Sequence, residues 1–313
     1  MDIVELTPDL HMLRFPVGQA YLLRDEDSLT LIDTGLPGAG TDIARTIRGI
    51  GMDPAALRHV VLTHFHGDHV GSAAEITTLG EVTVAAHRLD APVIRGERPG
   101  PPPVLLDWER PLYESITPNM PAVPPARVDR ELDGGEVLDV AGGAHILSIP
   151  GHTDGSIAVY LPRRRFLFTG DAVANVGGHT MLGVFNTDHA RAVDSFHRLA
   201  ELDVELACFG HGATEALQVD LAQVAEILLR LVRGAGLAPL CCGDHDKRRR
   251  RIRRTAGKLE VGRTCHRRPP RRRRNLVPRP RCATRPTGSA ARPSAGGRPS
   301  PRSAGPSSSS YRR

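Results

Sequence analysis

The run Thr63-His64-Phe65-His66-Gly67-Asp68-His69 places three imidazoles and one carboxylate within a few consecutive positions. Neutral imidazole nitrogens and carboxylate oxygens are the ligands that suit zinc and similar divalent ions. His64 and His66 are two residues apart, so in an extended segment they point to the same side. Asp68 and His69 follow a glycine at which the backbone can turn, which makes them candidates for a second ion beside the first. The cluster therefore predicts a metal centre.

Short apolar segments position this cluster and several other acidic or histidine residues. The run His59-Val60-Val61-Leu62 reads as a buried strand that delivers the cluster at its end. Three further predicted strands, over 145–149, 166–168 and 206–209, lead to a glycine-flanked His or Asp, and strand 28–33 ends at an aspartate. Loops at strand ends are where α/β scaffolds place their sites. The residues after these strands, in chain order, are Asp33, His152, Asp171 and His211.

The remaining pattern predicts a mixed α/β chain. Helical spacing predicts helices over 42–50, 70–79, 189–202 and 217–232, and strands are expected over 82–86, 127–132, 136–140 and 157–161. Segment 95–126 is rich in proline, so we expect little regular structure there. Because it carries the single tryptophan, Trp108, and Tyr113, it is interpreted as a lid or a wall of a substrate pocket. His179, in a glycine-rich loop after Asp171, is a further candidate substrate contact.

The charge of the chain is divided between two regions. Residues 1–246 carry 18 arginines, no lysine and 34 acidic residues, a formal charge of −16, whereas residues 247–313 carry 23 basic residues and one acid. We therefore predict a folded domain over 1–236 and a disordered Arg/Pro/Ser-rich tail over 237–313. The tail is a candidate for non-specific nucleic-acid binding. The competing hypothesis is a reading-frame artefact of a GC-rich gene, which the intact mass of the natively expressed protein would refute if it matched all 313 residues.

Other features predict a cytoplasmic protein without a membrane partner. No apolar run approaches the roughly 20 residues that span a bilayer, and the N-terminus lacks the basic and apolar regions of a signal peptide. The five cysteines are an odd number without a CxxC pattern, which argues against a disulfide framework.

The motifs THFHGDH, PGHTDGS, FTGDA and FGHG, in this order after LIDTG, resemble the metallo-β-lactamase-fold hydrolase superfamily over about residues 3–233. The segment from His87 to Arg130 is most similar to an uncharacterised actinobacterial-type branch. The resemblance implies a four-layer αββα sandwich with two metal ions at one edge. It also implies that His64, His66 and His152 hold the first metal, that Asp68, His69 and His211 hold the second, and that Asp171 bridges them. Asp33 and Thr63 would orient ligands.

The implied reaction is hydrolysis of a small carboxylic ester, lactone or thioester by a water between the two metals, with Asp68 as proton shuttle. The metals would be zinc, with iron or manganese as alternatives. A glutathione substrate, as in glyoxalase II, is disfavoured because only one clear helix follows His211. Two alternatives stay open: a nuclease of the tRNA-processing type, which the acidic body disfavours, and a persulfide dioxygenase with a single iron.

Overall fold

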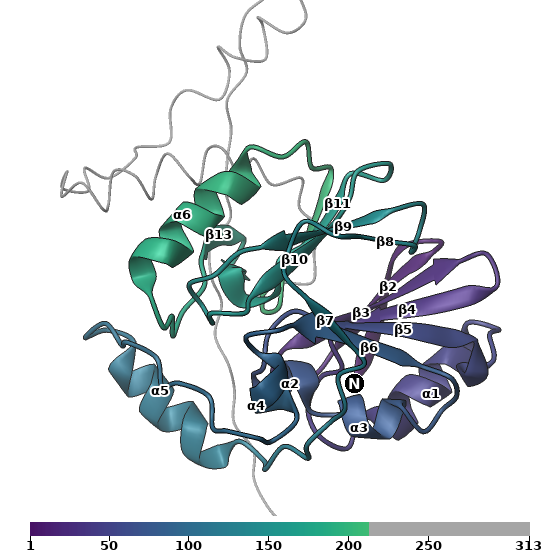
Figure 1. Cartoon of the computed structure of the whole chain (residues 1–313), viewed down its shortest axis with the longest axis horizontal. Coiled ribbons are helices and arrows are strands. Elements are labelled where there is room, and N and C mark those ends of the chain that lie inside the picture. Colours follow the sequence, from purple (N-terminus) through teal and green to yellow (C-terminus); the bar gives the residue numbers. More distant parts are fainter. Residues whose placement is uncertain (213–313) are drawn as a thin grey trace, which may run out of the picture. The chain divides into compact units, whose positions relative to one another are not determined.

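Two mixed β-sheets dominate residues 1–212, the part of the chain that this computed structural model describes (Figure 1). The first sheet has seven strands in sequential order: β1 (Asp2–Thr7), β2 (Leu10–Arg14), β3 (Gln19–Asp25), β4 (Ser28–Ile32), β5 (Leu57–Leu62), β6 (Thr83–His87) and β7 (Arg130–Leu132). The second sheet has the order β14 (Leu206–Cys208), β11 (Phe166–Phe168), β10 (Ile157–Leu161), β9 (Ala144–Ser148) and β8 (Val137–Leu138). β12 (Val173–Val176) and β13 (His179–Leu182) form a separate hairpin.

The sheet topology brings several strand ends to one edge. In the first sheet β1 to β4 pair antiparallel, and β4 to β7 pair parallel. In the second sheet β9 and β11 both pair antiparallel with β10, and β14 pairs parallel with β11. β9, β11 and β14 therefore run in the same direction. The backbone N–H of Ile157 donates to the carbonyl of Thr63 at 2.9 Å, which joins the two sheets at the end of β5.

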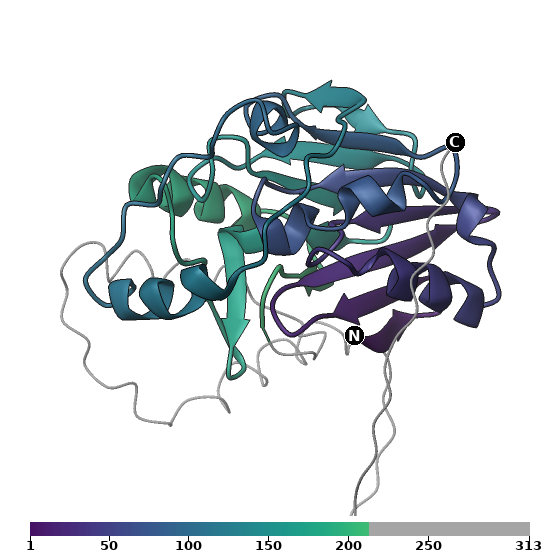
Figure 2. The same cartoon turned by 90° about the horizontal axis from the view of Figure 1, so that it is seen from below.

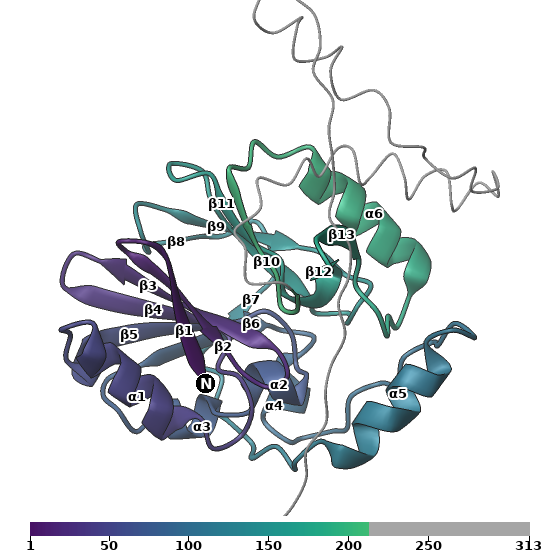
Figure 3. The same cartoon turned by 180° about the vertical axis from the view of Figure 1, so that it is seen from behind.

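Three apolar cores lie between the layers of the fold, one between the two sheets and one between each sheet and the helices outside it. The alternation of side chains along the strands explains how one strand contributes to two cores. In β10, Ile157, Val159 and Leu161 face the core between the two sheets, and Ala158 faces the outer core. Strands that are buried on both faces read as continuous apolar runs, as this one does. Figure 3 shows the two sheets face to face from behind.

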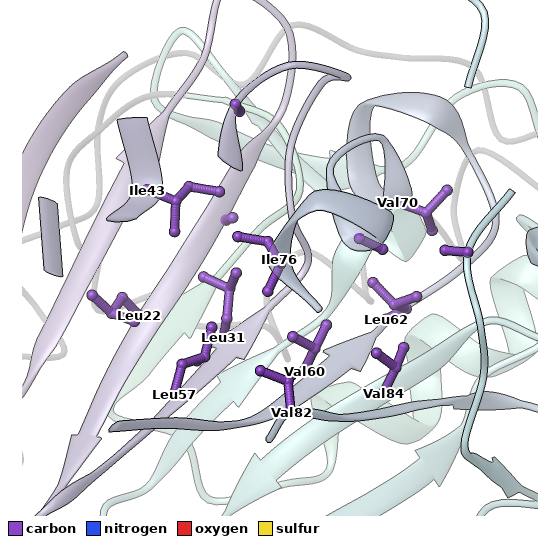
Figure 4. Close-up of a cluster of buried hydrophobic side chains, with 14 of the residues drawn as sticks. Leu22, Leu31, Ile43, Leu57, Val60, Leu62, Val70, Ile76, Val82 and Val84 are labelled. Atoms are coloured by element: carbon purple, nitrogen blue, oxygen red, sulfur yellow. The ribbon is translucent and has the colours of Figure 1, made fainter. Parts of the chain in front are cut away.

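Helices cover the outer face of each sheet (Figures 1 and 2). The first sheet packs against α1 (Gly40–Gly49), α2 (Gly67–Val70), α3 (Ala73–Ile76) and α4 (Ala91–Ile94), and the second packs against α6 (His189–Ala200). Figure 4 shows the first of these cores, in which Ile43 of α1 and Ile76 of α3 lie over Leu31 and Val60 of the sheet. The predicted αββα sandwich is thus confirmed.

The predicted helix over 70–79 is wrong, because the chain forms two short helices, α2 and α3, instead. Close packing at the break explains the interruption. A Cβ on Gly71 would lie 2.3 Å from the backbone nitrogen of Pro37. The next side chain, Ser72, donates to the carbonyl of Leu36 at 2.6 Å and accepts from the N–H of Ala39 at 2.8 Å.

The proline-rich segment contains more regular structure than we expected. It forms α5 (Arg110–Ile116) and a 3-10 turn, η2 (Thr117–Asn119). Pro111 lies in the first turn of α5, where a missing N–H costs nothing. The structure includes two other 3-10 turns, η1 (Pro54–Ala56) and η3 (Gly170–Ala172). His179, expected in a loop, begins strand β13, because Gly177 and Gly178 form the turn of the hairpin.

The helix predicted over 217–232, the domain boundary near 236 and the basic tail lie outside the described residues. Within residues 1–212, no helix has the length and apolar character needed to cross a membrane.

Candidate metal centre

Seven histidine and aspartate side chains meet at the edge where β5, β9, β11 and β14 end. Their donor atoms fall into two groups, each with all atoms within 4.8 Å of one another. The first group is His64, His66, His152 and Asp171, and the second is Asp68, His69, His211 and Asp171. Asp171, in η3 after β11, is common to both. All seven residues were predicted as metal ligands, and the structure brings all seven together.

In the first group, three imidazoles lie together, and two of them lie near one oxygen of Asp171. His66 Nδ1 lies 2.9 Å from His152 Nε2. Asp171 Oδ2 lies 3.8 Å from His64 Nε2 and 3.7 Å from His152 Nε2. Three nitrogens and one carboxylate oxygen form a donor set typical of zinc.

In the second group, two imidazoles lie between two carboxylates. His211 Nε2 lies 3.0 Å from Asp68 Oδ2 and 3.2 Å from Asp171 Oδ2. His69 Nε2 lies 3.1 Å from Asp171 Oδ1 and 3.7 Å from Asp68 Oδ2. This group has more oxygen donors than the first, and it carries more negative charge.

Hydrogen bonds at Nδ1 fix which nitrogen three of these histidines present. The hydroxyl of Thr63 donates to Asp33 Oδ2 at 2.8 Å, so it is left to accept from His64 Nδ1 at 3.1 Å. His69 Nδ1 donates to Asp33 Oδ2 at 2.8 Å. His152 Nδ1 donates to the carbonyl of Val184 at 3.1 Å. In each neutral ring the lone pair then lies on Nε2, which faces the other donors.

The site fits bound cations because several buried polar atoms have no hydrogen-bond partner within the described residues. These atoms include His64 Nε2, His69 Nε2 and Asp171 Oδ1. His69 Nε2 and Asp171 Oδ1 are close together, but they do not meet with hydrogen-bond geometry. Unpaired buried polar atoms are rare in folded proteins and call for a specific reason. Coordination of a divalent ion by these donors would supply such a reason.

The two groups differ in electrostatic character. Burial, together with the neighbouring His66, lowers the pKa of His152 to about 3, and burial lowers the pKa of His64 well below 6.5. Burial also opposes charge on His211, but the carboxylates of Asp171 and Asp68 outweigh it and raise its pKa to about 10. The first group therefore offers neutral imidazoles. In the second group, the carboxylates of Asp171 and Asp68 favour positive charge on His211, and they would equally favour a bound cation.

Two glycines allow the strand ends to approach this closely. Gly170 has a φ of +51°, and a Cβ there would lie 2.6 Å from the Thr63 hydroxyl. A Cβ on Gly210 would lie 2.0 Å from Asp171 Oδ1. The N–H of Gly210 donates to the carbonyl of Gly170 at 2.9 Å, which ties the β11 and β14 loops together. The glycines before Asp171 and His211 are thus needed because any side chain at these positions would collide with the neighbouring residues.

The three predicted substrate residues lie apart from these donor groups in the fold. Trp108 precedes α5 and is 57% exposed. Tyr113, on α5, packs edge to face against Phe185 with ring centroids 5.2 Å apart. His179 is exposed at the tip of the β12–β13 hairpin. The structure does not bring these three residues into the clusters of metal donors.

Sequence reasoning missed two buried carboxylates, Asp90 and Glu109. Glu109 is 1% exposed and accepts from the N–H of Phe185 at 3.0 Å and from that of Leu106 at 2.8 Å, so it attaches the α5 segment to the loop before α6. Asp90 follows β6 and contacts the loops that carry three of the histidines. The one signal for it was its position after a parallel strand, the same position that Asp33 occupies after β4.

Comparison with known proteins decides the family. The sequence model of the metallo-beta-lactamase superfamily matches residues 13–211, a range that contains every donor of both groups. The chain belongs to the metallo-beta-lactamase superfamily.

Similar proteins include two from Bacillus subtilis (strain 168). The uncharacterized protein YobT is 30% identical over 209 residues, which are 63% of this chain and 84% of YobT. The probable metallo-hydrolase YflN is 27% identical over 227 residues, which are 66% of this chain and 85% of YflN. A crystal structure of the superfamily protein TTHA1429 from Thermus thermophilus is similar with a TM-score of 0.55 and 26% identity, covering 73% of this chain and 80% of that one.

Proposed function

We propose that this protein is a dinuclear metal-dependent hydrolase of small carboxylic esters, lactones or thioesters. In this proposal His64, His66 and His152 would hold the first ion, Asp68, His69 and His211 would hold the second, and Asp171 would serve both. The observation that carries the proposal is the presence of Asp171 in both donor groups. One carboxylate between two cation sites is the arrangement typical of two-metal hydrolases.

The chemistry combines what the ions supply with what the protein's own residues do. When bound, two divalent ions, with zinc as the favoured metal, provide Lewis acidity at the substrate carbonyl and lower the pKa of water. Asp33 and Thr63 hold His64 and His69 in the orientation that ligation needs. Asp68 is the one carboxylate among the donors that belongs to a single group, so we assign proton transfer to it. Although burial opposes its charge, the adjacent His69 and His211 lower the pKa of Asp68 to about 2, and the ionised form is present at neutral pH.

Charge supports a small substrate of low charge over a nucleic acid. Residues 1–212 carry 16 arginines, no lysine and 29 acidic residues, a formal charge of −13. A body of this charge repels a polyanion. We infer an enzyme that acts on small molecules.

The segment 100–123, which contains α5, supports the proposal of an apolar wall for the substrate. A Cβ on Gly67, between His66 and Asp68, would lie 2.5 Å from Val123, and one on Gly100 would lie 2.4 Å from the ring of Phe65. Both ends of the segment therefore contact the loop that carries the metal ligands. Between these ends it exposes apolar side chains, namely Val104, Leu106, Trp108 and Leu112. We assign this surface to the acyl group of the substrate.

Replacing Trp108 by alanine is expected to raise KM about tenfold for esters with a long apolar acyl chain and to leave kcat nearly unchanged. The physical reason is that an apolar wall binds ground state and transition state alike. Steady-state kinetics with acetyl and octanoyl esters of one alcohol measures the effect. Val137→Ala, at an exposed apolar residue of β8, is the control. An equal effect on both esters would contradict the assignment.

Replacing Thr63 by valine is expected to weaken binding of one metal ion by roughly 10- to 100-fold, the range typical of groups that orient a ligand. Valine keeps the backbone N–H that donates to Asp33 Oδ1 at 2.8 Å but removes the hydroxyl between Asp33 and His64. Thr63→Ser keeps that hydroxyl and is the matched control. Competition with a chromophoric chelator measures the affinities. Equal affinities in the two variants would exclude this role of the hydroxyl.

The proposed function is tested with a substrate panel on the full chain reconstituted with zinc. The panel holds aryl esters, lactones, thioesters and phosphodiesters. We expect turnover of at least one carboxylic substrate class, its loss after removal of metal by a chelator, and its recovery with zinc. Cleavage of phosphodiesters without any turnover of carboxylic substrates would contradict the proposal.

A further inference from the structure

Asp90 is a buried carboxylate that belongs to neither donor group. It follows β6 at the start of α4 and is 2% exposed. Its oxygens accept three hydrogen bonds from two different loops. Asp90 Oδ2 accepts from the N–H of Phe65 at 3.1 Å and from the hydroxyl of Thr153 at 2.7 Å. Asp90 Oδ1 accepts from the N–H of Gly155 at 2.9 Å.

The two loops that Asp90 joins carry the three histidines of the first group. Phe65 lies between His64 and His66, at the end of β5 in the first sheet. Thr153 follows His152 in the loop between β9 and β10 of the second sheet. The distance of 2.9 Å between His66 Nδ1 and His152 Nε2 therefore spans two sheets. Within residues 1–212 and outside the two donor groups, Asp90 is the charged side chain that accepts hydrogen bonds from both loops.

We propose that Asp90 is the positioning residue of the first metal site, because it holds the loop of His64 and His66 at a set distance from the loop of His152. This inference rests on the proposed function, since it assigns a metal ion to the first donor group. Asp90 would act through the backbone and Thr153, without touching the ion or the substrate.

The packing around Asp90 leaves little freedom for its carboxylate. A Cβ on Gly155 would lie 2.4 Å from Asp90 Oδ1, so the loop can approach only because residue 155 is glycine. The hydroxyl of Thr153 lies 2.9 Å from that of Ser156, which also accepts from the N–H of Thr153 at 2.9 Å. Burial raises the pKa of Asp90 to about 6, and its three hydrogen bonds act in the opposite direction. The carboxylate is therefore mostly ionised at neutral pH and can accept from both loops.

Asp33 is a second buried carboxylate beside the site, and its hydrogen bonds differ from those of Asp90. It accepts from the N–H of Thr63 and from His69 Nδ1, at 2.8 Å each. The hydrogen bonds of Asp33 thus orient a ligand of the second group directly. Loss of Asp90 should therefore affect the first site, and loss of Asp33 should affect the second site as well.

The Asp90→Asn variant gives the sharpest test, because both oxygens of the carboxylate accept from a backbone N–H. The amide of asparagine must turn its NH₂ toward Phe65 or Gly155, so one of these N–H groups loses its acceptor. The packing volume stays the same. We expect one of the two Co²⁺ binding steps of the metal-free full chain to weaken by roughly 10- to 100-fold, with a changed visible absorption of that ion, and the other step to stay within twofold.

Three further variants make the result specific. Asp129→Asn is the matched control, because Asp129 accepts from the N–H of Val84 at 2.8 Å in the same sheet, away from the metal donors. His211→Ala removes a donor of the second group only, so it identifies the step that belongs to the first. Thr153→Val removes the hydroxyl between Asp90 and Ser156, and we expect it to weaken the first-group Co²⁺ step by a smaller factor. This variant keeps the proposal testable if Asp90→Asn does not fold.

The proposal is overturned if both Co²⁺ steps are unchanged in Asp90→Asn and Thr153→Val, or if both steps weaken equally. Selective weakening of the first-group step in either variant, with Asp129→Asn unchanged, supports it. The proposal on Asp90 is judged on Co²⁺ binding, and the proposed function is judged on ester turnover by the unaltered protein. The two can therefore fail separately.

Discussion

Replacing Asp171 by alanine is expected to lower ester hydrolysis by roughly a thousandfold or more and to reduce the metal content below two ions per chain. Asp171 is the donor common to both groups, so its loss takes one oxygen from each. Metal ions contribute several kcal/mol of transition-state stabilisation, and each 1.36 kcal/mol is a factor of ten in rate. We therefore expect the largest single-residue effect at Asp171.

The Asp171 effect is measured as metal per chain by elemental analysis, together with kcat/KM for the best ester. Asp154→Ala is the control, because Asp154 is exposed and bonds to Arg191 at 2.6 Å on the surface, in the loop that carries His152. Unaltered metal content in Asp171→Ala would show that the carboxylate does not bridge two ions.

Replacing Gly210 by alanine is expected to lower activity by about a hundredfold without removing any donor. The new Cβ would lie 2.0 Å from Asp171 Oδ1 and 2.8 Å from His69 Cε1, so one or both of these side chains must move. A displacement near 1 Å can cost about a hundredfold in rate. We expect weaker metal binding in parallel, because the oxygen that moves is a donor of the second group.

Gly49→Ala is the matched control for Gly210→Ala. Gly49 ends α1, and a Cβ there meets nothing within 4 Å. Alanine in a helix is favoured over glycine, so this variant should be as stable as the unaltered protein or slightly more stable. Both variants are compared by thermal unfolding, metal content and kcat/KM. Full activity in a folded Gly210→Ala protein would show that the close approach of Gly210 to Asp171 is not needed.

Much of the site could be predicted from sequence because the donors have local signals. His64, His66, Asp68 and His69 lie within six consecutive positions. The other donors, His152, Asp171 and His211, each lie beside glycine after an apolar strand, and this is the local chemistry that close approach requires. Their division into two groups came from the family resemblance, because strand order cannot be deduced from periodicity.

The residues that were missed depend on contacts between distant segments. Asp90 resembles any surface aspartate at a helix start, and its role appears only when the loops at Phe65 and Thr153 lie beside it. Glu109 is similar, because its partner Phe185 lies far along the chain. In both cases tertiary structure buries a carboxylate that the sequence presents as polar.

Two elements that differ from the predicted secondary structure do have sequence signals. Gly177-Gly178 between two β-prone segments is a strong hairpin signal, and it forms the β12–β13 turn. Pro111 lies in the first turn of α5, where proline is compatible with a helix. Proline content alone is thus a weak argument against local helices.

The most direct test of the central claim is metal reconstitution of the full chain with parallel measurement of ester hydrolysis. Metal-free protein is titrated with zinc, and bound ions and turnover are measured at each step. We predict two zinc ions per chain, no hydrolysis without metal, and full activity only when both ions are bound. Undiminished ester hydrolysis by the metal-free protein, or a single bound iron with oxygen consumption in place of hydrolysis, would contradict a two-metal hydrolytic centre.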